Sequence, residues 1–143
     1  GRVKQLDELE GEQREAAGEA LRDLLYGDIR FGTRFRDWLR ALKAGLEKRP
    51  SWRLVTALPA LVHPRDHVCV RQSAFRREAA IFGPSRLYSR RPKRTAYQNF
   101  LRISKQTWER LEEEGYSPRD FLDIHDFIWA TLRPSAEKHL EEE

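Results

Sequence analysis

The chain has 143 residues, of which 35% are charged and 39% hydrophobic, and its formal net charge is +4. A chain of this length fits one domain that buries roughly two-thirds of its unfolded surface, and four Trp, seven Phe and four Tyr supply bulk for its core. The longest apolar run near the middle, residues 54–62, is interrupted by Thr56 and Pro59 and is too short for a membrane span of about 20 residues, and no signal peptide is visible. We therefore expect a soluble protein that makes no membrane contact.

Cysteine and arginine usage indicate the setting. Cys69 is the single cysteine, which excludes an internal disulfide and favours a reducing, cytoplasmic compartment. The 21 arginines against 6 lysines, with no Met, are typical of thermophile proteins, although GC-rich codons give the same bias. Because Gly1 opens the chain without a Met, a whole protein and one domain of a longer chain both stay open.

Charge is segregated along the chain. Residues 65–94 carry nine basic and two acidic side chains, whereas residues 105–143 carry five basic and eleven acidic ones, and residues 1–23 are also net acidic. Such a basic centre attracts an anionic partner. It serves equally well to pack acidic terminal helices against the middle, and both readings stay open.

Apolar spacing predicts two long helices in the first third of the chain. Leucines and alanines recur every three or four residues over 6–26, and Gly27 with Asp28 is expected to end that helix. A second helix is predicted over 33–48, with Thr33 as its N-cap and Pro50 beyond its end. Residues 51–64 are predicted to form a short buried helix followed by a loop at residues 63–66.

The middle of the chain is where we expect any β-structure. Residues 67–71 are short, β-branched and bounded by turn residues, so they are the best strand candidate. A short helix is predicted over 74–82 with Ser73 as its N-cap, and Leu87 with Tyr88 could form a second short strand. Residues 90–94 are predicted to be a basic loop.

Two further helices complete the prediction. Thr95 and Gln98 match a capping box for a helix over 95–114 that ends at Gly115. Ser117 is predicted as the N-cap of the last helix, with Pro118 in its first turn, and residues 135–143 as an acidic tail. The fold class is therefore mainly α, with about five helices around one core and at most one short two-stranded β element. Residues 1–134 are expected to form this single domain.

Two clusters carry metal-ligand residue types. His63, His67 and Cys69 are close in sequence, but no further pair completes a zinc site, so a buried thiol beside two loop-edge histidines is the favoured interpretation. A nuclease would use Asp120 and Asp123 for Mg²⁺, with His125 and Asp126 nearby. Helix geometry turns His125 towards the apolar face, so a core role is favoured. We expect no catalytic residue, metal or cofactor.

The basic middle is the strongest functional signal. Guanidinium groups pair bidentately with phosphates, and aromatic rings stack on bases. The basic loop also precedes a helix N-terminus, which itself favours phosphate. The candidate nucleic-acid-binding residues are Arg71, Arg76, Arg77, Arg86, Tyr88, Arg90, Arg91, Lys93 and Arg94.

Residues 117–129, which read Ser-Pro-Arg-Asp-Phe-Leu-Asp-Ile-His-Asp-Phe-Ile-Trp, carry a resemblance. The string resembles the P-R-D-x-x-D-x-x-x-F-I-W ending of a family of uncharacterised bacterial proteins with no known activity. Residues 25–28, residues 59–71 and the helix around Tyr97 are also similar to that family. The resemblance implies a fold more than a function, because capping and an aromatic core face explain the motif equally well.

The sequence as a whole favours a non-catalytic nucleic-acid-binding or accessory domain, in which the central arginines contact DNA or RNA phosphates. One alternative is a protein–protein interaction or dimerisation domain, whose partner is another protein or another domain of a longer chain. The other alternative is a metal-dependent nuclease.

Overall fold

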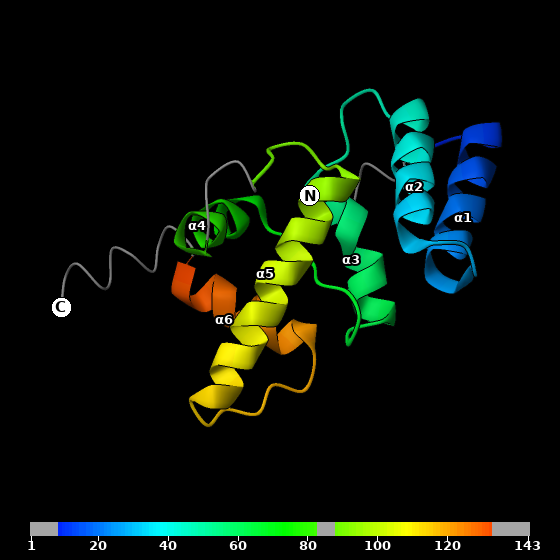
Figure 1. Cartoon of the computed structure of the whole chain (residues 1–143). Coiled ribbons are helices and arrows are strands. Elements are labelled where there is room, and N and C mark those ends of the chain that lie inside the picture. The colour runs from blue at the N-terminus through cyan, green and yellow to red at the C-terminus, as the bar shows by residue number, and fades with distance from the viewer. Residues whose placement is uncertain (1–8, 83–87, 133–143) are drawn as a thin grey trace.

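The protein is mainly α, as the sequence predicts, with six helices in the computed structural model, which describes residues 9–82 and 88–132. No strand occurs within those two ranges. None of the helices in them is long and apolar enough to cross a membrane. The helices are α1 Gly11–Tyr26, α2 Phe31–Gly45, α3 Trp52–Val62, α4 Gln72–Phe82, α5 Arg94–Glu113 and α6 Phe121–Leu132 (Figure 1).

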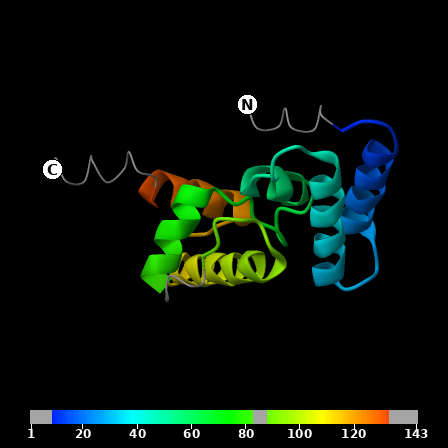
Figure 2. The same ribbon diagram turned by 90° about the horizontal axis from the view of Figure 1, so that it is seen from above.

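The helices form two groups that meet at α3. Helices α1 and α2 are an antiparallel pair at one end of the molecule, and α4, α5 and α6 pack together at the other (Figure 2). Helix α3 lies between the groups and contacts both α1 and α6. This arrangement brings the loop before α3 and the loop before α5 to the same edge of the molecule (Figure 1).

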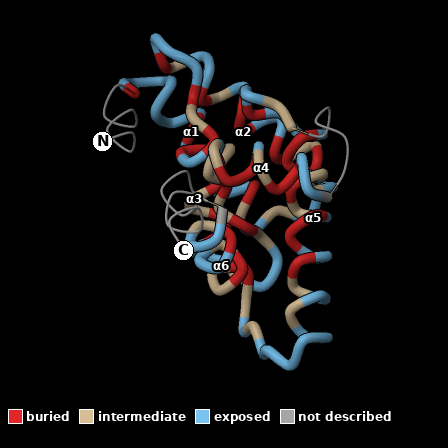
Figure 3. The backbone as a smooth tube through the Cα atoms, turned by 90° about the vertical axis from the view of Figure 1, so that its left-hand side faces the viewer, coloured by how far each residue is buried: buried red, intermediate tan, exposed pale blue. Residues whose placement is uncertain are grey.

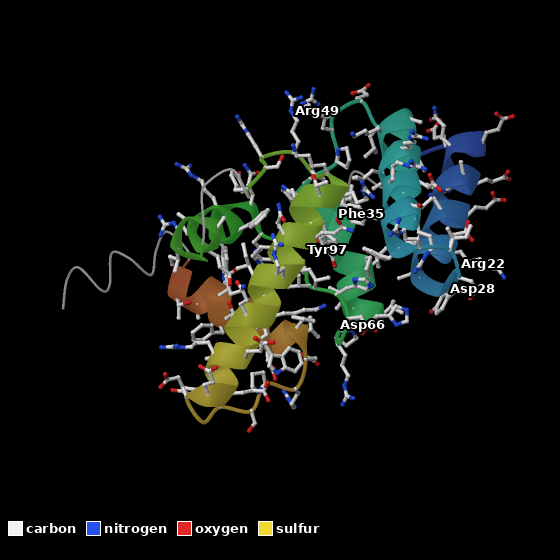
Figure 4. The ribbon with its side chains drawn as sticks, in the orientation of Figure 1. Arg22, Asp28, Phe35, Arg49, Asp66 and Tyr97 are labelled. Carbon is white, nitrogen blue, oxygen red and sulfur yellow. The ribbon has the colours of Figure 1, made fainter. Side chains whose placement is uncertain are left out.

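An aromatic core joins the two groups. Phe35 of α2 stacks on Tyr97 of α5, with ring centroids 4.9 Å apart (Figure 4), and Phe75 of α4 meets Phe100 of α5 edge-on at 4.4 Å. These four side chains are almost fully buried. Figure 3 shows the buried residues on the inward faces of the helices, as expected when each amphipathic helix turns its apolar stripe to a common core.

Side chains from later in the sequence close the C-terminal end of α1. The last carbonyls of a helix have no partner within it. Here the Arg34 guanidinium donates to the carbonyl oxygens of Asp23 and Leu24, at 3.1 and 2.6 Å. His63 Nε2 donates to the Leu25 carbonyl at 2.7 Å. The α1–α2 turn is therefore tied to both α2 and the end of α3.

Helix α3 continues through Pro59, which the sequence suggested would limit it. Proline has no backbone N–H, so the carbonyl of Val55, four residues earlier, loses its helical donor. The indole Nε1 of Trp38 donates to that carbonyl at 3.1 Å. A side chain of α2 thus replaces the missing hydrogen bond, and the predicted short buried helix runs its full length to Val62.

The predicted strand over residues 67–71 is wrong. The segment has no helical or strand assignment, and Val68 and Val70 are fully buried. Its amides bond to side chains: Val68 N donates to Tyr97 Oη at 3.4 Å, and Val70 N to Thr56 Oγ1 at 2.8 Å. The alternation of apolar residues correctly predicted that Val68 and Val70 are buried. Their amides bond to hydroxyl groups on neighbouring helices and not to a partner strand. Leu87, half of the second strand candidate, lies outside the described residues.

Four predicted N-caps are wrong by two or three residues. Thr33, Ser73 and Thr95 each lie in the first turn, because the helices begin at Phe31, Gln72 and Arg94. Ser117 lies well before α6, and Asp120 caps that helix instead, its Oδ1 accepting from Leu122 N at 2.9 Å and Asp123 N at 3.1 Å. Polar residues followed by apolar runs mark helix starts only approximately.

The glycine predicted to end α5 is confirmed. Gly115 has φ +91°, its N–H bonds to the Glu112 carbonyl, and Tyr116 N bonds to the Leu111 carbonyl. This is the left-handed glycine stop expected at that position. Helix α2 ends at Gly45, three residues before the predicted end at Lys48. The predicted start of the first helix at residue 6 and the acidic tail at 135–143 lie outside the described residues.

Candidate nucleic-acid interface

The structure brings together about half of the predicted site residues. Arg71, Arg76 and Tyr88 line one surface hollow, and Arg90 and Arg91 line the hollow next to it. The other candidates do not line these hollows. Arg77 is half-buried on α4, Lys93 and Arg94 are exposed at the start of α5, and Arg86 lies outside the described residues.

The first hollow has a volume of about 450 Å³ and lies where α3 and α4 begin. Three arginines from three parts of the chain line it: Arg53 in the first turn of α3, Arg71 just before α4, and Arg76 within α4. Aromatic side chains of Trp52, Tyr88 and Trp129 form the rest of the wall, together with Ser51, Val70, Gln72 and Ser73. The hollow therefore combines cationic groups with aromatic faces.

Arg71 is held in a fixed orientation. Its Nε donates to His125 Nε2 at 3.0 Å, and its guanidinium lies over the Trp129 ring, 4.3 Å from the ring centroid. Since His125 Nε2 accepts, the ring proton is on Nδ1, which donates to Asp126 Oδ1 at 3.1 Å. One edge and one face of the guanidinium are thus occupied. The two terminal nitrogens remain as a fork beside the hollow, the geometry that binds phosphate bidentately.

Two further hollows continue from the first along the same edge of the molecule. The second, of about 330 Å³, shares Ser51, Trp52 and Gln72 with the first. The third, of about 400 Å³, shares Arg49, Pro50, Arg91 and Pro92 with the second. Because neighbouring hollows share wall residues, the three hollows adjoin one another, and we call them together the basic groove. Its cationic residues are Lys43, Lys48, Arg49, Arg53, Arg71, Arg76, Arg90 and Arg91.

The Trp52 side chain, at the start of α3, bonds to the loop before α5, and both segments line the basic groove. Its side chain is buried, and its Nε1 donates to the Ser89 carbonyl at 2.8 Å. Ser89 Oγ in turn donates to the Arg91 carbonyl at 2.8 Å. On the other side, Ser51 Oγ caps α3 by accepting from Leu54 N at 3.1 Å. The chain at residues 51–52 and at residues 89–91 is therefore positioned by hydrogen bonds.

The charge of the basic groove is not neutralised within the described residues. Glu47 is the one acidic side chain that these stretches contribute to its lining. No ion pair joins a groove cation to any carboxylate in residues 9–82 or 88–132; the ion pairs there lie elsewhere, as in Arg110 with Glu113 and Glu114. The described acidic residues of α1 and α5 therefore form no direct ion pair with the groove cations.

Sequence reasoning missed half of the groove cations. Lys43, Lys48, Arg49 and Arg53 lie before the arginine-rich segment, at the end of α2 and the start of α3. Their local sequence reads as ordinary helix ends, and only packing places them beside Arg71 and Arg91. Trp129 also lines the basic groove, and nothing in the sequence indicated its contact with Arg71.

The other candidate clusters have structural partners. His67 Nδ1 lies 3.0 Å from Tyr97 Oη, and burial lowers the pKa of His67 to about 4, so the imidazole is neutral and accepts from the tyrosine. Burial also raises the pKa of the Cys69 thiol. In the part of the chain that the structure describes, no three His, Cys, Asp or Glu side chains come together in a group that could hold a metal ion.

The carboxylates of the nuclease hypothesis are also engaged. Asp120 caps α6, and Asp123 Oδ2 accepts from Arg119 N at 2.9 Å and from Arg119 Nε at 3.3 Å. These hydrogen bonds hold the pKa of Asp123 below its usual value. His125 is half-buried, as predicted for a core side chain, but its partner is the groove residue Arg71.

Comparison with known proteins gives no relative to this chain. No protein-family model matches it, and neither a curated protein nor a solved structure shows significant similarity. The resemblance of residues 117–129 to a bacterial family therefore stays an expectation.

Proposed function

We propose that this domain binds nucleic acid without catalysing a reaction, and that it contacts the sugar–phosphate backbone along the basic groove. The observation that carries the proposal is the groove itself: eight cationic side chains line three adjoining hollows whose described acidic lining is Glu47 alone. A row of such groups fits a polymer of regularly spaced phosphates and neutralises several of them at once.

Three local features support this partner. The terminal nitrogens of Arg71 are pre-oriented by His125 and Trp129, so little side-chain entropy is lost when a phosphate binds. Helices α3 and α4 both begin beside the first hollow, and the positive ends of their dipoles favour an anion. Tyr88 and Trp129 are half-buried in the same wall, where an unstacked base would find an aromatic surface.

The test is fluorescence anisotropy with a labelled DNA duplex and the matching single strand, titrated at several salt concentrations. We expect binding that weakens linearly on a log–log plot, with a slope set by the number of phosphates neutralised. Charge reversal by Arg49→Glu or Arg53→Glu should weaken binding at least tenfold and lower that slope. Absence of binding to either substrate at low salt would falsify the proposal.

The matched control is Arg65→Glu. Arg65 is exposed in the turn after α3, next to Asp66, at the opposite end of that helix from Arg49 (Figure 4). An equal loss of affinity in this variant would show that binding depends on the net charge of the protein and not on the groove. Poly-glutamate of matched length is a second control: if it competes as well as DNA, the partner is an acidic protein surface.

A second candidate function, protein–protein interaction, is favoured by a separate observation. Tyr26 is 68% exposed and packs edge-on against His63, which follows the exposed Leu61 and Val62 in the sequence. Exposed apolar groups gathered in one place mark protein contacts more often than single ones do. Light scattering tests self-association: a dimer that Tyr26→Ser returns to monomer supports this function, and a monomer at all concentrations removes homodimerisation.

A further inference from the structure

A buried carboxyl group forms part of an apolar hollow that shares no lining residue with the basic groove. The hollow has a volume of about 290 Å³ and lies between α4, α5 and α6, which pack together in Figure 1. Its lining is almost entirely hydrocarbon, from Ile81, Leu111, Phe127 and Ile128 among others. Ile81 and Phe127 are 64% and 42% exposed, so the hollow opens to solvent.

Glu78 lies in the wall of this hollow and has no exposed surface. Its Oε1 lies 2.6 Å from Thr107 Oγ1, whereas Oε2 is buried without a hydrogen-bond partner. A buried acceptor left without a donor destabilises the folded protein, and more so if it is charged. The carboxyl therefore has one oxygen held by the fold and one buried oxygen that the described residues leave without a donor.

No charged side chain contributes to the pKa of Glu78, so a cationic ligand is a donor that fits this carboxyl group. Burial raises the pKa of Glu78 to about 7, the hydrogen bond from Thr107 opposes this, and no charged group contributes. From α5, Arg110 reaches the rim of the hollow, where its guanidinium is paired with Glu113 and Glu114. From α6 the hollow is lined by Phe127, Ile128 and Thr131, none of which is charged.

We propose that this hollow binds a hydrocarbon group that carries one protonated amine, with the hydrocarbon on Ile81, Leu111, Phe127 and Ile128 and the ammonium donating to Glu78 Oε2. The apolar wall provides the area for a phenylalkyl or alkyl chain, and the carboxylate provides the single polar anchor, the usual composition of a small-molecule site. A charge-assisted hydrogen bond in a water-poor wall is among the stronger ones available to a protein. The site is independent of the basic groove.

Binding is coupled to the protonation of Glu78. A protonated amine favours the ionised carboxylate, so binding below about pH 7 requires Glu78 to lose its proton to solvent. An alkyl amine stays protonated well above that pH. The affinity for the amine therefore rises as the pH rises through about 7 and then levels off.

Isothermal titration calorimetry on the full chain tests the proposal with three probes of similar shape: phenethylamine, phenethyl alcohol and hydrocinnamate. We expect phenethylamine to bind most tightly, with proton release below pH 7, and hydrocinnamate to bind most weakly. Glu78→Gln should weaken phenethylamine about tenfold or more, the loss of one charge-assisted hydrogen bond. Phenethyl alcohol should bind Glu78→Gln as it binds the wild type, which shows that the hollow is intact.

Glu109→Gln is the matched control, because Glu109 is exposed on α5 and does not line the hollow. It should leave all three affinities unchanged. Equal binding of phenethylamine and hydrocinnamate, or an unchanged affinity for phenethylamine in Glu78→Gln, would overturn the proposal. So would the absence of phenethylamine binding to the full chain at pH 8.

Discussion

The hydroxyl of Thr107 has one proton and two possible acceptors. Its Oγ1 lies 2.6 Å from Glu78 Oε1 and 3.0 Å from the Ile103 carbonyl oxygen. When Glu78 is protonated, the carboxyl donates to Thr107 and the hydroxyl donates to Ile103, so both bonds form. When Glu78 ionises, the hydroxyl can satisfy only one of the two acceptors. The neutral carboxyl is thus the better fit to the fold, in agreement with its raised pKa.

The folded protein should therefore lose stability as Glu78 ionises. The folded-state pKa of about 7 lies above the ordinary value of 4.5, so between these values the folded chain retains a proton that the unfolded chain has lost. The contribution is complete below pH 4.5 and disappears as the pH rises to about 7, a change of about 3 kcal/mol. In urea unfolding across this range, the difference in free energy of unfolding between the wild type and Glu78→Gln should show that slope, and the difference between the wild type and Glu109→Gln should not. A wild-type minus Glu78→Gln difference that stays flat with pH would contradict the assignment to Glu78.

The pKa shift of His67 changes the stability of the folded protein with pH in the opposite direction. Burial lowers its pKa from 6.5 to about 4, so the folded protein resists a proton that the unfolded chain accepts. Its contribution to stability is present above pH 6.5 and lost as the pH falls towards 4. The two groups offset one another over much of the mildly acidic range, and the effect of Glu78 is read from the difference between wild type and Glu78→Gln.

Arg71 and His125 should be distinguishable by their salt dependence. Arg71→Ala removes a charge at the basic groove, so the affinity for DNA should fall and the salt slope should fall by about one. His125→Leu leaves that charge but removes the acceptor that orients it, so affinity should fall several-fold with the slope unchanged. His125→Gln, which retains an acceptor, should restore part of the affinity. If His125→Leu lowers the slope as Arg71→Ala does, then His125 does more than position Arg71.

At the scale of single elements, α6 shows how a cap can be misassigned from sequence. Ser117, Pro118 and Asp120 fit a helix start in which the serine caps. In the structure the aspartate caps, because its carboxylate bonds to two amides in the first turn, and the helix begins at Phe121. The pattern contains two residues able to cap, and the choice between them depends on where Phe121 enters the core.

Substitution of the two candidate caps should separate them. Asp120→Ala should lower the free energy of unfolding by about 1 kcal/mol, since two first-turn amides lose their acceptor. Ser117→Ala should change it by less than about 0.5 kcal/mol, because Ser117 is exposed and precedes the helix. Chemical denaturation measures both, and the reverse order would restore the serine as the cap.

Trp38 and Pro59 form a pair whose coupling can be measured. Trp38→Phe removes the donor to the Val55 carbonyl, which should cost about 1–3 kcal/mol in addition to the lost volume. Pro59→Ala returns a backbone N–H to that carbonyl. Trp38→Phe should therefore cost less in the Pro59→Ala background, by about 1 kcal/mol, while the volume loss cancels between backgrounds. Strictly additive effects in this double-mutant cycle would mean that the indole does not replace the missing helical donor.

At the scale of the whole molecule, the sequence predicts which segments are helical better than it predicts which segments lie side by side. Hydrophobic periodicity located α1, α2, α3 and α5 and gave the fold class, because each helix buries a stripe that repeats along the chain. It could not separate buried extended chain from strand at Val68 and Val70, where the amides are satisfied by Tyr97 and Thr56. That distinction depends on residues about 14 to 29 positions away.

The basic groove escaped prediction for a related reason. The arginine-rich segment at 71–94 is visible in the sequence, but the groove takes cations from the ends of α2 and α3 as well, and it excludes Arg77 and Arg94. Each contributing loop is short and locally unremarkable. Their meeting at one edge follows from the packing of α3 between the two groups of helices (Figure 2). Packing between segments that are far apart in the sequence produces no pattern within any one of them.

The positions of the tryptophans have a practical consequence. Trp52 and Trp129 line the basic groove, whereas Trp38 and Trp108 lie in other packing environments, the latter edge-on against Phe121. An indole is the dominant intrinsic fluorophore of a protein, and its emission depends on its immediate surroundings. A nucleic acid in the groove would displace water from beside Trp129 and bring bases within quenching distance of it. The domain thus carries a built-in optical probe of occupancy, and Trp129→Phe should extinguish most of the signal while the other three indoles continue to emit.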